Sequence, residues 1–193
     1  MHRTQFDPQL LFESVAPLLC RNHGRQIVVR ADGSVITVLA WGGESPVLRV
    51  WKEQTQIGEH LLSGPSSAPC LLADGNGATL WLSVNDKVCV SSRLTEAPVP
   101  IGGCEGSLED VASDGQGRTV VAVRRGTALT LSITTGTSIQ ADLPIIDENA
   151  GRASIEFDDA GILHLAFEKL HGIEYRQLQI DGSKLRLDRK SVM

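Results

Sequence analysis

The sequence predicts an all-β protein, namely a β-propeller-like array of about four four-stranded antiparallel blades. The first observation is a turn of Asp and Gly, followed by an apolar strand, that occurs four times. The glycines that close these turns are Gly33, Gly77, Gly117 and Gly161, so the copies are spaced by 44, 40 and 44 residues. The second observation is that the segments after the turns alternate in polarity or are apolar throughout. A period in the low forties, built from turn-rich strands, is typical of a propeller blade.

The composition is that of a globular protein, and it limits the classes of partner. Of the 193 residues, 41% are hydrophobic and 21% are charged, which excludes a disordered or collagen-like chain. The net charge of -5 would repel a phosphate backbone, and Lys and Arg are spread along the chain. No stretch approaches the length of apolar sequence that a membrane span needs. We therefore expect neither a nucleic acid nor a membrane as a partner.

The four cysteines, Cys20, Cys70, Cys89 and Cys104, show no C-x-x-C pair, and the histidines do not lie at ligand spacing beside them. We expect isolated thiols in or near strands, no metal site and no cofactor. The N-terminus has no apolar core followed by a cleavage site. The expected location is therefore the cytoplasm, and an extracellular location stays open for a chain whose leader has been removed.

Residues 1–24 stand before the repeats and fit two structures. Asp7 and Pro8 favour the start of a helix, because Asp caps a helix and Pro is tolerated at its first position. Pro17 would end such a helix after about two turns. In the alternative, residues 9–15 form an outer strand that completes the sheet of another blade. The segment is expected to be either an N-terminal helix or a closing strand.

The four blades are expected within a domain of residues 25–193, at about residues 25–64, 65–103, 104–146 and 147–189. The expected strands of the first two blades are 26–30, 35–41, 47–51 and 58–62, then 70–73, 79–84, 88–92 and a short edge near 99. Those of the last two blades are 108–112, 119–123, 128–133 and 138–143, then 153–157, 162–167, 173–179 and 185–187. The second strand of each blade is nearly continuous in Val, Leu, Ile and Ala. Such continuity is expected where both faces of a sheet pack against neighbouring blades.

The Asp and Gly pairs are expected to form hairpin turns. A tight hairpin needs backbone positions with positive φ, which Gly adopts freely and Asp or Asn at small cost. A calcium loop is the alternative for the second and third turns, but each offers one carboxylate, which is too few for that ion. The residues to which we assign a structural role in the turns are Asp32, Gly33, Asp74, Gly77, Asp114, Gly117, Asp159 and Gly161.

Residues 157–167, followed by residues 172–176, resemble the repeat of the sialidase-like, or BNR-type, β-propellers. In that repeat an Asp and Gly turn precedes an apolar strand that often carries His, and a later strand ends in Tyr and Arg. The resemblance implies a propeller, and it raises a glycoside hydrolase in which a Tyr is activated by a Glu and three arginines bind the substrate carboxylate. The stricter Asp-box, S-x-D-x-G-x-x-W, has no intact copy, because Trp41 and Trp81 follow their turns at other spacings.

The residues needed for catalysis are sparse. Tyr175 is the only tyrosine, and its neighbour Glu174 should point to the opposite face of the sheet, so it is poorly placed to act as the base. The sequence has no G-x-S-x-G elbow, no phosphate-binding GxxxxGK[ST] loop and no HExxH motif. The sequence therefore favours a protein without catalytic activity.

The loops between second and third strands should all emerge on one face of a propeller. We take their polar residues as the candidate binding site, because binding residues concentrate on loops that a rigid scaffold positions. Among the tryptophans, Trp41 is placed to stack on a sugar ring, whereas Trp51 and Trp81 are expected in the packing between blades. The candidate binding residues are Trp41, Glu44, Asp86, Lys87, Arg124, Arg125, Glu168 and His171.

The function expected from the sequence is a non-catalytic binding or scaffolding module that recognises a protein through loops on one face. The alternative is a carbohydrate-binding, lectin-like module or a sialidase-like glycoside hydrolase. An array that does not close would expose apolar faces at its ends, and such faces seek a partner. In that case we expect self-association through residues 1–24 and the last blade.

Overall fold

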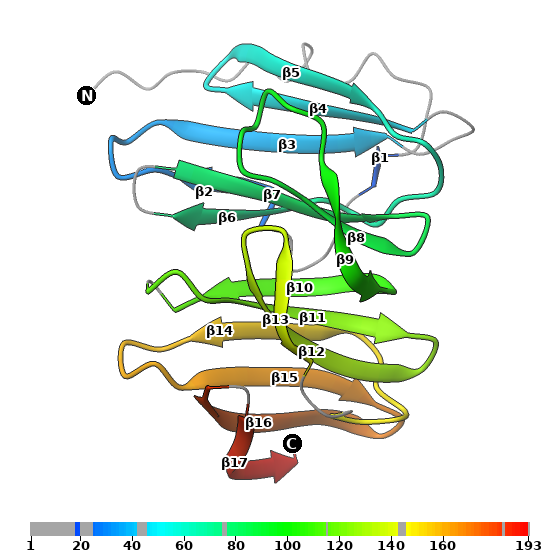
Figure 1. Cartoon of the computed structure of the whole chain (residues 1–193), viewed down its shortest axis with the longest axis vertical. Helices are drawn as coiled ribbons and strands as arrows, with labels where there is room; N and C mark the ends of the chain where they lie inside the picture. Colours follow the sequence, from blue (N-terminus) through cyan, green and yellow to red (C-terminus); the bar gives the residue numbers. More distant parts are fainter. Residues whose placement is uncertain are drawn as a thin grey trace.

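The structure, a computed structural model, describes residues 18–19, 25–41, 46–74, 77–114, 116–142, 146–182 and 184–192. In this part of the chain all regular structure is strand, and no helix is present (Figure 1). The predicted all-β class is therefore confirmed. Of the N-terminal segment only β1 (Leu18–Leu19) is described, and it pairs with the end of the third strand. The choice between helix and strand over residues 9–15 lies outside the described residues.

The remaining strands form four antiparallel meanders, which we call sheets 1 to 4. Sheet 1 consists of β2 (Ile27–Val29), β3 (Val35–Trp41), β4 (Val47–Lys52) and β5 (Thr55–Leu61). Sheet 2 consists of β6 (Cys70–Asp74), β7 (Gly77–Val84), β8 (Lys87–Ser91) and β9 (Val99–Glu105). Sheet 3 consists of β10 (Ser107–Ser113), β11 (Thr119–Arg125), β12 (Ala128–Thr135) and β13 (Ser138–Asp142). Sheet 4 consists of β14 (Ala153–Phe157), β15 (Leu163–Lys169), β16 (Gly172–Asp181) and β17 (Lys184–Val192). Each strand expected from the sequence is present, and β9 and β17 extend well beyond their expected ends.

The sheets are arranged in a row with two ends. Their first strands contact one another in succession, β2 with β6, β6 with β10 and β10 with β14, and these strands lie in the middle of the molecule (Figure 1). Sheet 1 and sheet 4 lie at opposite ends of the long axis, at the top and the bottom of the view. The array is therefore open in the part of the chain that the structure describes.

Three hydrophobic cores lie between successive sheets. Val50 and Leu80 belong to the core between sheets 1 and 2. Trp81 and Val121 belong to the core between sheets 2 and 3, and Phe167 belongs to that between sheets 3 and 4. Sheets 2 and 3 therefore bury both faces, whereas sheets 1 and 4 each bury one face in these cores.

Burial along the second strands follows from this layering. In β7 and β11 four consecutive residues are buried, 80–83 and 120–123, as expected for strands packed on both faces, whereas in β3 and β15 buried and half-buried residues alternate. Trp81 lies between sheets, as expected. Trp51 does not, because it pairs with Thr37 on the face of sheet 1 that points away from sheet 2. The prediction that both faces of every blade are packed is thus wrong for sheets 1 and 4 within the described residues.

Sheets 2 and 3 are also joined at their outer strands, which the sequence did not lead us to expect. Ser138 of β13 pairs in parallel with Gly102 of β9, and this single pairing makes one eight-stranded sheet of the two meanders. Two consecutive glycines, Gly102 and Gly103, lie in β9 at this point, and Gly103 has a φ of 79°. The left-handed φ of Gly103, and not lack of space, requires glycine at this point.

A carboxylate holds each of three turns between first and second strands. In the first and third turns, Oδ1 of Asp32 and of Asp114 accepts a hydrogen bond from the backbone N–H two residues on, at 2.9 and 2.8 Å. In the fourth turn Asp158 makes this bond, at 3.0 Å, whereas Asp159 is exposed. In the second turn the backbones of Asp74 and Gly77 pair across the hairpin, and residues 75–76 lie outside the described residues.

Glycines at the ends of these turns adopt the left-handed backbone conformation. Gly33, Gly117 and Gly161 have φ values of 80°, 91° and 75°. A Cβ built on any of the three would meet no atom within 4 Å. The need for glycine at these positions therefore comes from the backbone conformation and not from lack of space.

We predict that Gly117→Val destabilises the protein by about 1–3 kcal/mol, the cost of holding a β-branched residue at positive φ. Urea denaturation followed by tryptophan fluorescence measures the loss. Gly102→Val is the matched control, because Gly102 also has open space around its Cβ but is a strand residue without a left-handed φ. Equal losses in the two variants would contradict the argument.

Candidate functional site

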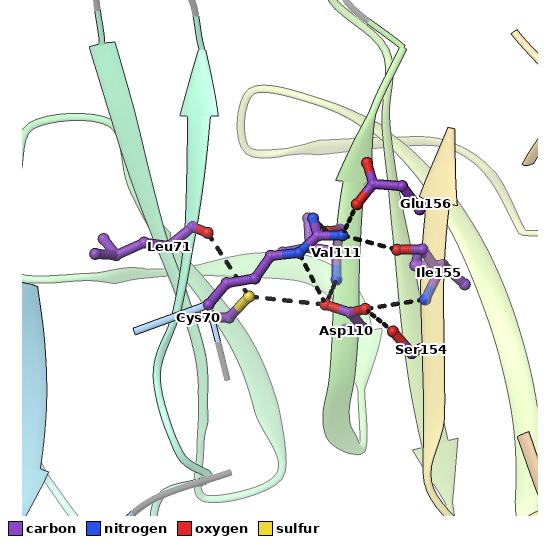
Figure 2. Close-up of polar contacts among 8 residues, drawn as sticks. Cys70, Leu71, Asp110, Val111, Ser154, Ile155 and Glu156 are labelled. Carbon is purple, nitrogen blue, oxygen red and sulfur yellow. Dashed lines mark hydrogen bonds and ion pairs between the residues drawn. The ribbon is translucent and has the colours of Figure 1, made fainter. Parts of the chain in front are cut away.

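The arginine that precedes β2 connects sheet 1 to all three other sheets. The guanidinium of Arg25 donates hydrogen bonds to the carbonyl oxygens of Val111 at 2.6 Å and Ile155 at 2.9 Å, and it forms an ion pair with Glu156 (Figure 2). Its own carbonyl oxygen accepts a hydrogen bond from the N–H of Leu71 at 2.5 Å. One residue thereby contacts β6, β10 and β14 at the point where the first strands meet.

Asp110 of β10 is the buried partner of Arg25. Its Oδ2 accepts hydrogen bonds from the hydroxyl of Ser154 and the N–H of Ile155, both at 2.9 Å (Figure 2). Its Oδ1 accepts from the N–H of Val111 at 2.9 Å, contacts the Cys70 sulfur at 3.8 Å and lies 4.0 Å from Nε of Arg25. Only 3% of the side chain is exposed.

We call Arg25, Cys70, Asp110, Ser154 and Glu156 the axial cluster. Each oxygen of the buried carboxylate is engaged by more than one group of the protein, so the cluster holds sheets together and offers no open position to a ligand. None of these five residues was predicted from the sequence to form a site. The available signal was a pair of acids inside the apolar segment 108–112, where both faces were expected to be buried.

A β-bulge accounts for the adjacent acid. The pairing of β10 with β11 skips one residue between Leu108 and Asp110, so Glu109 is the extra residue. Glu109 is buried, and its Oε1 accepts a hydrogen bond from Nε of Arg124 at 2.9 Å. Arg124, a predicted binding residue, is therefore part of the internal structure of sheet 3.

The other described residues of the predicted binding site lie on turns that follow one edge of the molecule. The turns β7–β8, β11–β12 and β15–β16 are all on the right in Figure 1. Asp86, Lys87 and His171 are exposed. Nε of Arg125 donates to the carbonyl oxygen of Glu105 at 2.9 Å, and Oε2 of Glu168 accepts from the backbone N–H of residue 152 at 3.2 Å. The structure does not bring these residues together in a cleft, and the Trp41 side chain and Glu44 lie outside the described residues.

Two hollows of the described surface lie at the opposite ends of the same strands. A hollow of about 290 Å³ opens between sheets 2 and 3, with buried Leu72, Trp81 and Val90 at its floor. Its rim contains Val99, which is 48% exposed, the carboxylate of Glu96, and small residues from the β8–β9, β10–β11 and β12–β13 turns. Residues from two sheets form this hollow, so no local sequence motif marks it.

A second, polar hollow of about 430 Å³ lies between the β10–β11 and β14–β15 turns. Asp114 and Asp158, from opposite sides, both line it. Burial raises the pKa of Asp114, but hydrogen bonds from Arg118 and from two backbone N–H groups outweigh it, so the pKa is lowered. The hydrogen bond with His164, followed by backbone N–H groups, lowers the pKa of Asp158. Both carboxylates are thus held as anions by their own turns.

Asp158 also begins a chain of side chains on the outer face of sheet 4. Its Oδ2 lies 3.0 Å from Nε2 of His164, and Nδ1 of His164 lies 2.5 Å from the hydroxyl of Tyr175. Glu174 is buried on the other face, where its Oε1 accepts a hydrogen bond from Nε of Arg176 at 2.6 Å. Glu174 therefore cannot activate Tyr175, and the imidazole is the group in reach of the phenol.

No cluster of three or more His, Cys, Asp or Glu suited to a metal ion occurs among the described residues. Cys70, Cys89 and Cys104 are buried, and burial raises the pKa of the Cys89 thiol. In the same part of the chain there is no helix of the length and hydropathy that crossing a membrane requires.

Comparison with known proteins gives a likeness of fold. No protein-family model and no curated protein sequence matches this chain. The structure of U3-55K is similar, with a TM-score of 0.54 and 11% sequence identity over 85% of this chain. This chain spans 65% of the length of that one. At this level of identity the match concerns the fold alone, and the resemblance to sialidase-like repeats stays a prediction.

The axial cluster generates the first prediction for this region. Asp110→Asn should destabilise the protein by about 3 kcal/mol, because an amide has one acceptor oxygen where two are used and Arg25 loses its buried counter-charge. Guanidinium denaturation measures this loss. Asp181→Asn is the control, since Asp181 and Arg186 form an exposed pair whose removal costs under about 1 kcal/mol. A similar small loss in both variants would show that the cluster is not a structural tie.

The turn carboxylates generate a prediction on pH. The pKa of Asp114 is lower in the folded chain than its ordinary value of 3.8, so its stabilisation is fully present above that pH and is lost as the pH falls through the folded value. At neutral pH Asp114→Asn should cost about 1.5–3 kcal/mol, as for a hydrogen bond to a charged group.

Below about pH 4 the difference in free energy of unfolding between wild type and Asp114→Asn should shrink, because the carboxylate is protonated in the unfolded chain first and in the folded chain at a lower pH. Thermal unfolding between neutral pH and about pH 2.5 measures it. Asp159→Asn serves as the control for an exposed neighbour in the fourth turn. A difference between wild type and Asp114→Asn that stays constant with pH would refute the assignment.

Proposed function

We propose that this protein is a non-catalytic binding or scaffolding module made of propeller-like blades, and that a protein partner docks in the hollow between sheets 2 and 3. The observation that carries the proposal is the chemistry of that hollow, an apolar floor with a rim whose one charged residue, Glu96, is paired with Arg93. Apolar pockets with a few polar groups at the rim are the usual binding sites of proteins. The buried ionic clusters of the described residues, in contrast, are engaged in holding the fold.

The propeller part of the proposal rests on the geometry of the sheets. Each sheet is a four-stranded meander, and the first strands of all four meet around Arg25. A propeller places the first strand of each blade next to its axis. The parallel pairing of β13 with β9 departs from separate blades, so we propose an open array of four blades whose middle pair is joined.

A protein is favoured over a sugar because the hollow has no exposed aromatic ring. Trp81 is 3% exposed, and its Nε1–H is engaged by Oγ1 of Thr79 at 2.9 Å. A sugar-binding site generally needs an aromatic face for stacking, and Trp81 cannot offer one. Val99 and Ala97 at the rim instead suit an apolar side chain from a loop of the partner.

A glycoside hydrolase is the second candidate, and the hydrogen bond between Tyr175 and His164 favours it. An imidazole held by a carboxylate accepts the proton of a nucleophile in many hydrolases. Two points weigh against it. Asp158 also binds two backbone N–H groups of its own turn, and the polar hollow beside it is lined by the β10–β11 and β14–β15 turns and not by Tyr175.

The test is a selection of phage-displayed random peptides on the full chain. Selected peptides should contain an apolar anchor, and Val99→Asp should weaken their binding at least about tenfold, since a carboxylate at the rim opposes burial of that anchor. Lys87→Glu is the control, because it changes an exposed residue of the predicted rim on the other edge.

Three results would contradict the proposal. Peptides weakened by Lys87→Glu and not by Val99→Asp would place binding on the predicted rim. Binding on a glycan array without any peptide binding would indicate a lectin. Turnover of an aryl glycoside that disappears in Tyr175→Phe would indicate the hydrolase.

A further inference from the structure

The two end faces of the array differ in chemistry. We define the outer face of sheet 1 by Ile27, Val29, Leu39, Val47, Trp51 and Leu61, which cross-strand pairing places on the side away from sheet 2. None of these side chains belongs to the three cores of the described residues. Ile27, Val29 and Leu61 are 62%, 65% and 76% exposed.

The outer face of sheet 4 is polar by comparison. Pairing places Glu156 opposite His164, and Tyr175 opposite Ala166, on the side away from sheet 3. The face carries the chain of hydrogen bonds from Asp158 to Tyr175. Covering it with an apolar sheet would remove these groups from water, which is costly.

From this difference we propose that the outer face of sheet 1 is an interaction surface for a second copy of this chain, with the two sheet 1 faces packed against each other. The sequence of β3 supports a cover, because Val35 and Leu39 are apolar on the face that none of the three cores covers, as in strands that are buried on both sides. The fourth sheet is unsuited as the covering surface, so the copies meet first sheet to first sheet. Self-association through the last blade, as expected from the sequence, is not favoured.

The charges on this face indicate a second copy as the partner. Nε of Arg49 and Oε2 of Glu59 lie 2.7 Å apart in the middle of the face, both partly exposed. The hydrogen bond with Arg49 is the main cause that lowers the pKa of Glu59, so the carboxylate is charged at neutral pH. A two-fold axis that lies in the plane of the contact, midway between these side chains, sets Arg49 of each copy against Glu59 of the other, which gives four alternating charges. A different protein would have to supply a matched pair.

The small area of the outer face of sheet 1 predicts a weak, reversible dimer. Three strands of six or seven residues and one of three residues, about 4.8 Å apart, present an area of roughly 350 Å². A stable interface buries about 800 Å² on each partner, so the dimer should be reversible and form at micromolar concentration. This surface is separate from the hollow between sheets 2 and 3, and the inference does not rest on the function proposed for it.

Sedimentation equilibrium of the full chain between roughly 1 and 100 µM tests the proposal, a range chosen to bracket a micromolar dimer. A monomer–dimer equilibrium is expected, and the double variant Val29→Lys with Leu61→Lys should raise its dissociation constant at least about tenfold. Both side chains are exposed, so thermal stability should stay unchanged. Leu170→Lys, at an 89% exposed position in the β15–β16 turn, is the matched control and should leave the dimer intact.

A pair of charge reversals identifies the two-fold contact. Arg49→Glu alone gives an acidic face and Glu59→Arg alone a basic face, so each variant should self-associate at least about tenfold more weakly than the wild type. A mixture of the two variants should form a one-to-one heterodimer. Loss of a contact within the monomer would not produce this recovery.

Three results would overturn the proposal. The first is a wild-type chain that stays monomeric up to about 100 µM, which would mean that the face is covered by the chain itself or by another protein. The second is a dimer broken by Ile173→Lys, on the outer face of sheet 4, which would indicate head-to-tail contact. The third is a mixture of charge variants that stays monomeric.

Discussion

The buried carboxylate of Asp110 is the constraint on which the arrangement of the sheets depends. Removing an ion from water costs several kcal/mol unless hydrogen bonds and an opposite charge offset the cost. Here the offset comes from Ser154 and Ile155 of sheet 4 and from Arg25 next to sheet 1. These partners reach the carboxylate only when the first strands lie at one spacing and one register. The apolar cores provide most of the free energy of packing, but they are less selective about register than this group is.

The strands could be predicted from the sequence because their signals are local. A glycine at positive φ and an Asp that accepts the N–H two residues on recur in the turns, and apolar segments follow them. The same signals led us to Asp159 in the fourth turn, where two consecutive aspartates occur, whereas Asp158 is the one that binds the backbone. Local chemistry thus defined the strands, while the exact acceptor needed coordinates.

The axial cluster and the hollows could not be predicted, because their residues are distant in sequence. Arg25 and Ile155 are 130 positions apart, and the stacking of the sheets had to be known before they could be paired. The charged residues chosen on the predicted rim drew attention because charge is visible in a sequence. Two of them, Arg124 and Arg125, bind atoms of sheets 2 and 3 instead. The residues around the apolar hollow are uncharged except for Glu96, so little in the sequence distinguished them from ordinary strand ends.

Because β13 pairs with β9, sheets 2 and 3 are held together more strongly than sheets 1 and 4 are held to them. Sheets 2 and 3 are one hydrogen-bonded sheet with apolar cores on both sides, whereas sheets 1 and 4 adjoin them through side-chain packing and the contacts of Arg25 and Asp110. Local opening in proteins follows such differences, and contiguous units open at lower free energy than the whole. Sheets 2 and 3 should therefore be the last unit to unfold. Sheets 1 and 4 can each unfold separately at a lower free energy. Amide protons of β7 and β11 would then exchange with solvent last. A partner that binds sheet 1 or sheet 4 would stabilise the part of the fold that unfolds at the lowest free energy.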